Sequence, residues 1–312
     1  MNMYQQKLQI LLMILLFNIS IVSEANDRIK NLTANMELSS GYNSNVFYGS
    51  QNELIEETST ESASDIQHSI ILNAGYKYFN GSNSDAKLYV DYYYDKLQDN
   101  DVDYSTIDLS LPYSYYTKTL RLRVTPLLSS FKSSGVSALQ NYGISLNLTL
   151  KLGFYRAGIS SLIIKNKVID ESYSAYEGSS NNAYVFLEKH SFSSQTSLKL
   201  GVANYNYQQT IEGDESNAVY YIGSNYLFFK GRKEIVFTGK VQAKKYVTDP
   251  FNGFNRTDYN VKLSVAPAYR LSKSIKLFVK AQYMINRSNL ATETEDKNYD
   301  QTQFNIGVAW RL

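Results

Sequence analysis

The sequence contains no cysteine, and its 312 residues include only 2 histidines, 1 tryptophan and 4 prolines. Without cysteine the chain can form no disulfide and has no thiol nucleophile. The formal net charge of +2 argues against a nucleic-acid partner. No metal-ligand spacing and no phosphate-binding glycine loop occurs. We therefore expect no catalytic residue, no metal site and no cofactor.

Long apolar runs are also scarce, because only the stretch from Leu8 to Phe17 is uncharged and largely apolar. This stretch follows Lys7 and precedes Ser23 and Ala25, which are small residues at the −3 and −1 positions of a plausible cleavage site. The run has about ten residues, whereas a membrane-spanning helix needs about twenty. The sequence therefore predicts a secretory signal peptide over residues 1–25 and one domain over residues 26–312 without a membrane helix.

What the sequence has instead is alternation of apolar and polar residues from one end to the other. Helical spacing is hard to find, and the 28 tyrosines favour strands and interfaces. We count about fourteen alternating segments, most of about nine to twelve residues. Clear examples are 32–38, 70–78, 107–113, 142–150 and 275–281.

The connections between these segments are of two kinds that alternate along the chain. Asn, Gly, Ser and Lys mark the short ones, as expected of hairpin turns, whereas the long ones are polar. Seven long loops and six short turns give an up-and-down meander with both chain ends on the short-turn side. The short turns lie at 79–84, 116–119, 151–154, 189–193, 230–232 and 271–274.

This layout predicts an all-β fold, a transmembrane antiparallel barrel of about 14 strands. In lipid every backbone N–H and C=O needs a partner within the protein, so a sheet can span only when it closes. We place the barrel in the outer membrane of a Gram-negative bacterium, with the long loops outside the cell and both termini in the periplasm. A soluble β-sandwich is the alternative, but it explains only the tyrosines and not the alternation of loop lengths.

The best-patterned strand is the last one, in which Phe304, Ile306, Val308 and Trp310 fall on one side. Barrel closure would pair this strand with the first and place its apolar side against lipid. A C-terminal strand with an aromatic residue near its end also resembles the signal that outer-membrane barrels present to their assembly machinery. The expected partners are therefore outer-membrane lipids and that machinery.

Aromatic residues gather near the strand ends, as expected of girdles at the two membrane interfaces. Tyrosine suits this position because its ring is apolar and its hydroxyl is polar. The residues that we assign to the girdle on the short-turn side are Tyr78, Tyr113, Tyr115, Tyr155, Phe228, Tyr269 and Trp310.

The strand face opposite the apolar stripe is polar and rich in cations, while acidic residues are concentrated in the long loops. Rings of Lys and Arg bias a pore towards anions or phosphorylated solutes. The simpler alternative is that these charges are only the solvated wall of the lumen. The residues expected to line the lumen are Arg121, Arg123, Lys151, Arg156, Lys199, Lys240, Lys276, Lys280 and Arg311. The first four fall on three successive strands near one turn and are the first candidates for a constriction or docking point.

Catalysis has little support in the sequence. Some outer-membrane barrels are lipases or proteases that use a histidine with serine or aspartate. Here His190 falls in a short turn, and His68 is out of phase with the lumen-facing positions of its strand. We therefore expect the chain not to be an enzyme.

Two stretches resemble a known family. ELSSGYNSNVFYGS at 37–50 resembles the opening strand of the C-terminal barrel domain in surface lipoprotein assembly modifiers, and NRSNLATETEDKNYDQTQFNIGVAWRL at 286–312 resembles their closing hairpin. The resemblance implies a barrel of about fourteen strands and a role in moving lipoproteins to the cell surface. Many members carry a helical-repeat domain before the barrel, and this sequence has no such repeat.

The sequence thus leads to a porin-like passive channel with a basic lumen that mildly favours small anionic solutes. One alternative is a barrel for surface display or export of a lipoprotein or another surface protein, which rests on the resemblance. Another is a structural or adhesive barrel whose acidic loops contact other surfaces. A fatty-acid transporter is a further alternative, although the sequence has no N-terminal plug segment.

Overall fold

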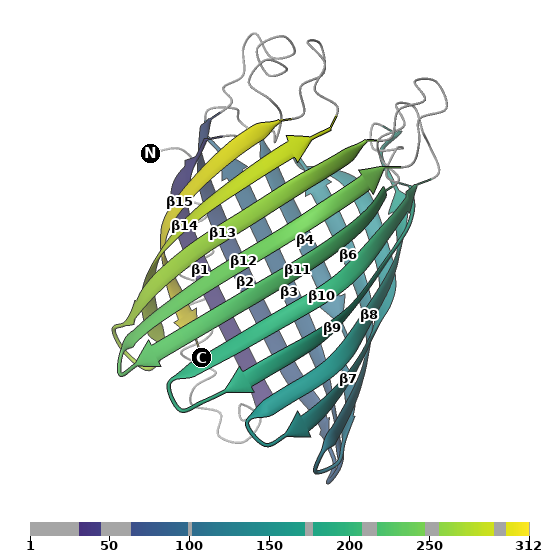
Figure 1. The fold of residues 1–312 in the computed structure, drawn as a ribbon, viewed down its shortest axis with the longest axis vertical. Coiled ribbons are helices and arrows are strands. Elements are labelled where there is room, and N and C mark those ends of the chain that lie inside the picture. Colours follow the sequence, from purple (N-terminus) through teal and green to yellow (C-terminus); the bar gives the residue numbers. More distant parts are fainter. Residues whose placement is uncertain are drawn as a thin grey trace.

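The computed structural model describes residues 31–44, 64–98, 102–171, 177–207, 217–246, 256–289 and 298–311. The expected signal peptide at 1–25 and most of the long loops lie outside these residues. Within them, no helix is long and apolar enough to cross a membrane. The elements of this described part are β-strands (Figure 1).

Most strands have 13 or 14 residues, somewhat more than the sequence pattern indicates. A tilted strand needs only about ten residues to cross the hydrocarbon layer, so the pairing continues beyond it. The strands are β1 (Leu32–Asn43), β2 (Asp65–Asn80), β3 (Ser84–Leu97), β4 (Asp103–Ser110), β5 (Tyr113–Tyr116), β6 (Leu120–Ser133), β7 (Val136–Leu152), β8 (Tyr155–Val168), β9 (Gly178–His190), β10 (Ser194–Tyr207), β11 (Asn217–Lys230), β12 (Lys233–Tyr246), β13 (Thr257–Arg270), β14 (Ile275–Ser288) and β15 (Tyr299–Arg311).

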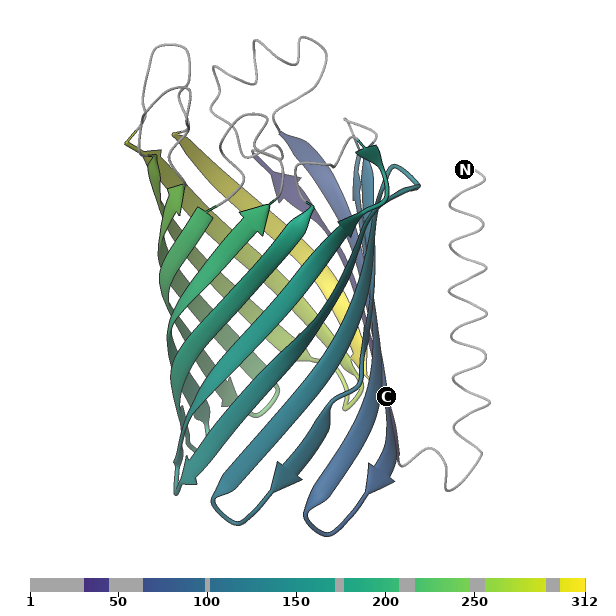
Figure 2. The same ribbon diagram turned by 90° about the vertical axis from the view of Figure 1, so that its right-hand side faces the viewer.

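These strands form one closed antiparallel sheet, because β15 pairs with β14 on one side and with β1 on the other. Figures 1 and 2 show the strands wound around a cylinder at a steep tilt. At the seam the buried amide Nε2 of Gln301 donates to Oδ1 of Asn43 at 2.8 Å. The predicted all-β barrel and the pairing of the last strand with the first are therefore confirmed.

One strand of the barrel is interrupted. The alternation over 107–113 predicts a single strand, but β4 ends at Ser110 and β5 begins at Tyr113. Both pieces pair with β3 and with β6, so together they are one of fourteen crossings. The break falls at Leu111 and Pro112, because proline has no N–H to give to the sheet.

The connection between β6 and β7 also differs from the sequence expectation. It is one of the seven connections expected to be long, but it is a two-residue turn of Ser134 and Gly135. Both residues have positive φ, 47° and 79°, which is the geometry of the tight turns that fit the twist of a hairpin. The expected count of seven long loops is therefore wrong, because this connection is short.

The two faces of the sheet differ sharply in polarity. Along the middle of β7 the exposed side chains are Tyr142, Ile144, Leu146, Leu148 and Leu150, and less exposed residues, mostly polar, alternate with them. The buried side chains of the described part are mostly polar, the opposite of a soluble barrel with an apolar core. The apolar face is therefore the outer surface, and the polar face lines the interior.

This assignment predicts a position-dependent cost for a buried charge. Ile144 lies on the outer face at the middle of β7, and Ser145 beside it faces the interior. We expect Ile144→Arg to destabilise the folded barrel by about 2–4 kcal/mol, because the cation would sit at the bilayer midplane. Ser145→Arg is the matched control and should change the unfolding free energy little, since its partners Thr125 and Leu162 are uncharged. Urea unfolding in lipid vesicles measures both, and equal effects would contradict the assignment.

Candidate functional site

Two arginines share one buried serine near the short-turn end of the barrel. Nη2 of Arg121 lies 3.2 Å from Oγ of Ser114, and Nε of Arg123 lies 3.3 Å from the same atom. Lys151 and Arg156 are direct partners across the next hairpin, between β7 and β8. The structure therefore groups the four expected cations on three successive strands near this end.

Another expected cation, Lys276, already has an acidic partner. Glu234 forms ion pairs with Arg270 and with Lys276, whose Nζ lies 3.6 Å from Oε2 of the glutamate. The sequence analysis did not single out this glutamate, although it alternates in phase with the interior residues of β12. Lys276 is therefore part of an ion-pair network, and Arg311 lies exposed at the end of β15.

Three interior lysines form a row at mid-height, which we call the lysine row: the expected residues Lys199 and Lys240, and Lys262, which is the register partner of Lys240. Lys199 pairs with Gly223, Gly223 with Lys240, and Lys240 with Lys262, so the row crosses β10 to β13 in one register. Within the described part of the chain, no carboxylate oxygen lies within 4.0 Å of the ammonium groups of the row. The positive charge of the row is therefore not compensated locally.

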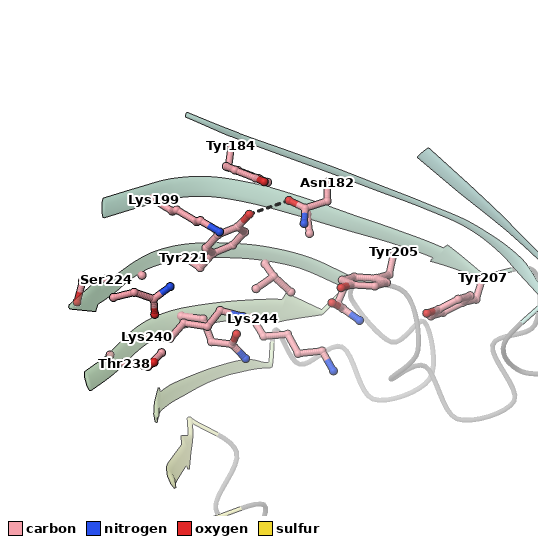
Figure 3. Close-up of a pocket in the computed structure, with 17 residues that line it drawn as sticks. Asn182, Tyr184, Lys199, Tyr205, Tyr207, Tyr221, Ser224, Thr238, Lys240 and Lys244 are labelled. Atoms are coloured by element: carbon pink, nitrogen blue, oxygen red, sulfur yellow. Dashed lines mark hydrogen bonds between the residues drawn. The ribbon is translucent and has the colours of Figure 1, made fainter. Parts of the chain in front are cut away.

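Lys199 and Lys240 of the lysine row border a hollow of about 780 Å³ in the interior wall (Figure 3). The ammonium of Lys199 lies 5.2 Å from the ring centre of Tyr184, and that of Lys240 lies 5.0 Å from the ring centre of Tyr221. The lining residues that the structure describes include lysines, tyrosines and amides, and none of them is acidic. Cations beside aromatic faces and amide donors make this hollow a surface for an anionic or hydrogen-bonding solute.

A glycine shapes this hollow. Tyr221 reaches from β11 across β10 and donates its hydroxyl to Oδ1 of Asn182 on β9 at 2.9 Å (Figure 3). The ring passes over Gly201, whose strand lies between the other two. A Cβ atom on Gly201 would approach Tyr221 to 2.5 Å and Cβ of Tyr184 to 2.7 Å. The absent side chain of Gly201 therefore allows the tyrosine to span two strands.

Filling this space should disturb the hollow. We expect Gly201→Val to displace Tyr221, to break its hydrogen bond with Asn182 and to destabilise the barrel by about 1–3 kcal/mol. Gly223→Ala is the matched control, because its new Cβ would meet only one backbone oxygen, at 3.7 Å. Urea unfolding of both variants in vesicles is the measurement. A Gly201→Val barrel as stable as the control would show that the tyrosine does not depend on the glycine.

The seven expected girdle residues lie close to the short-turn ends of their strands. Tyr78 is two residues before the end of β2, Tyr155 is the first residue of β8, and Trp310 is the last but one of β15. Among the seven, Tyr78, Tyr113, Tyr115, Tyr155 and Tyr269 are exposed. Their role as a membrane-interface girdle stays a prediction.

The two histidines lie apart in the described structure. Nε2 of His68 is 3.3 Å from Oε1 of Gln98, and Nε2 of His190 is 3.3 Å from Oε2 of Glu188. No group of three or more metal-ligating side chains is found among the described residues.

The closed sheet, the apolar outer face and the polar interior define the class: the chain is an outer-membrane β-barrel of fourteen strands. No family model and no curated protein matches it. Solved structures share its fold at low identity, for example OccAB2 of Acinetobacter baumannii, with 11% identity, a TM-score of 0.50, and 91% of this chain and 99% of that chain covered.

Two further structures extend this comparison. OmpT expressed in the outer membrane of Vibrio cholerae has 9% identity and a TM-score of 0.50, with 90% of this chain and 97% of that chain covered. OccK1 (OpdK) of Pseudomonas aeruginosa has 8% identity and a TM-score of 0.45, with 92% and 100% covered. At such identities the likeness concerns the fold. It contains no indication of the surface lipoprotein assembly modifiers, and that resemblance stays a prediction.

Sequence reasoning did not single out Tyr221, Gly201 or Glu234 as parts of the site. Their importance depends on which residues face each other across neighbouring strands, and this register is not visible in any one strand. The phase of the alternation does place all three on the interior face, and it was the only signal available.

Proposed function

We propose that the chain is a porin-like passive channel whose basic lumen mildly favours small anionic solutes. The observation that carries the proposal is the uncompensated lysine row, because ammonium groups without local counter-ions attract anions from the pore water. The cations Arg121, Arg123, Lys151 and Arg156 would extend this attraction to the short-turn mouth. Lys280, which faces the same interior, adds to it.

The orientation is part of the proposal. Long loops would lie outside the cell and both termini in the periplasm, so that the girdle near the short turns meets the inner leaflet of the outer membrane. The outer face would contact membrane lipids, and β15 would be the strand presented to the assembly machinery. Residues 1–25 would direct export as a signal peptide, and residues 26–312 would form the barrel.

Planar-bilayer recordings of the purified, refolded chain test the channel. We expect stepwise conductance and, under a KCl gradient, a reversal potential of the sign given by chloride. The absence of conductance from folded protein would overturn the channel, and a reversal potential of the opposite sign would overturn its anion preference.

A second candidate is a barrel for export of a surface lipoprotein. The observation in its favour is that parts of the two family-like stretches come together, since β1 and β15 are direct neighbours at the seam. Deleting the gene should then remove a lipoprotein from the cell surface, as measured by protease shaving of intact cells. An unchanged set of surface lipoproteins would end this candidate.

A further inference from the structure

Two aspartates face each other directly in the barrel interior. Asp91 on β3 is the register partner of Asp108 on β4, and both fall on the interior face. The amide Nδ2 of Asn73 donates to Oδ1 of Asp91 at 2.7 Å. Among the described residues, no cation forms an ion pair with either carboxylate. We call Asp91 and Asp108 the acidic pair.

The lysine row contains the counterpart of opposite sign. Lys240 on β12 is the register partner of Lys262 on β13, again without an ion pair in the described structure. We call these two residues the lysine pair. Like charges directly opposite each other on neighbouring strands destabilise a sheet. Each of the two pairs is therefore a structural cost, as is the pair of Lys151 and Arg156 near the short-turn end.

The two pairs lie at the same height. Asp91 is seven residues from the short-turn end of its strand, and Asp108 is eight residues from the end of β5. Lys240 is seven residues and Lys262 eight residues from the corresponding ends of β12 and β13. All four residues are thus near the middle of crossings of fourteen residues.

The two pairs also lie on opposite walls. The acidic pair lies on the third and fourth crossings and the lysine pair on the eleventh and twelfth, so the pairs are eight crossings apart in one direction and six in the other. Figure 1 shows β3 and β4 in the far wall of the barrel and β12 and β13 in the near wall. The interior therefore has a negative and a positive side at mid-height, and the field between them runs across the pore.

We propose that this transverse field selects zwitterionic solutes, such as amino acids and short peptides. A solute with one ammonium and one carboxylate would align with its ammonium towards the acidic pair and its carboxylate towards the lysine pair. Such a solute gains from both walls, whereas a simple ion is attracted by one wall and repelled by the other. The inference rests on the proposed channel and names the class of solute that its mid-height section favours.

The test compares solutes in swelling assays on vesicles that contain the refolded chain. Glycylglycine is the zwitterion and arabinose is a neutral solute of similar size. The quantity to compare is the entry rate of glycylglycine divided by that of arabinose. We expect this ratio to be about three times the ratio for a neutral pore. Failure of both solutes to enter would overturn the channel itself, and entry of both without this preference would overturn the inference alone.

Two double variants give a signature that net charge cannot produce. Asp91→Asn with Asp108→Asn should lower the zwitterion preference and shift the reversal potential towards anions. Lys240→Gln with Lys262→Gln should also lower the preference but shift the reversal potential towards cations. The inference would be overturned if the zwitterion preference rose in one double variant and fell in the other. It would also be overturned if the preference stayed unchanged in both while the reversal potentials shifted.

Lys118→Gln with Lys273→Gln is the control. It also removes two positive charges, but from the turn segments between β5 and β6 and between β13 and β14, away from mid-height, so the zwitterion preference should not change. Both tested variants remove like-charge repulsion and should fold, which heat-modifiable migration on gels verifies. If one variant does not fold, the other still decides the proposal, because each alone must lower the preference.

Discussion

Replacing Lys240 and Lys262 together by glutamate should turn an anion-favouring pore into a cation-favouring one. The change amounts to four units of charge on one wall. At about 10 Å from the pore axis, in water at about 0.1 M salt, this corresponds to roughly 0.6 kcal/mol for each permeating ion. Anions lose and cations gain this amount, so the permeability ratio should fall about tenfold. The measurement is the reversal potential in a planar bilayer under a KCl gradient.

The control for this experiment is a double variant that makes the same change in net charge, but at two lysines on the outer face of the barrel. Lys165 and Lys167 are exposed on β8, in phase with the outward-facing Ile163. Their double replacement by glutamate should leave the reversal potential nearly unchanged, because their charges lie outside the pore and are screened. If the two double variants shift the potential equally, the selectivity does not come from the lysine row. The effect of the interior variant should also shrink at high salt.

Removing β15 should abolish the folded barrel altogether. This strand pairs with β14 and with β1, and without it both neighbours become open edges. Each unpaired backbone group in lipid costs several kcal/mol, so an open sheet cannot span the bilayer. The two edges cannot re-form the antiparallel seam, because β1 and β14 run in the same direction. Refolding of a chain that ends at residue 298 into detergent or lipid should yield no heat-modifiable, protease-resistant species.

A circular permutant separates closure from the identity of the chain end. In this control β15 precedes β1 and is joined to it by a short linker on the short-turn side, where Arg311 already pairs with Asn35. All strand pairings are kept, so the permutant should refold in vitro. Failure of the permutant would mean that the position of β15 at the end of the chain matters, and not only its pairing. Refolding of the truncated chain would contradict the need for closure.

Much of the architecture follows from the sequence. The alternation of Tyr142, Ile144 and the residues that follow them on β7 identified a strand and also the face that lies on the outside of the barrel. Interior cations such as Lys199 and Lys240 were found from the same phase. The failures were local in origin: Pro112 interrupts a strand whose apolar alternation is unbroken, and Ser134 with Gly135 forms a tight turn where a long loop was expected.

The sequence by itself determined the strands, their polarity and the need for closure, because alternation is a local property and lipid tolerates no open edge. Only the tertiary structure decided which residues meet. It brought Gln301 to Asn43 across 258 positions, gave Lys276 its partner Glu234, and set Asp91 against Asp108. These encounters depend on strand register and barrel closure, and a slip of one residue would turn every side chain of a strand to the other face.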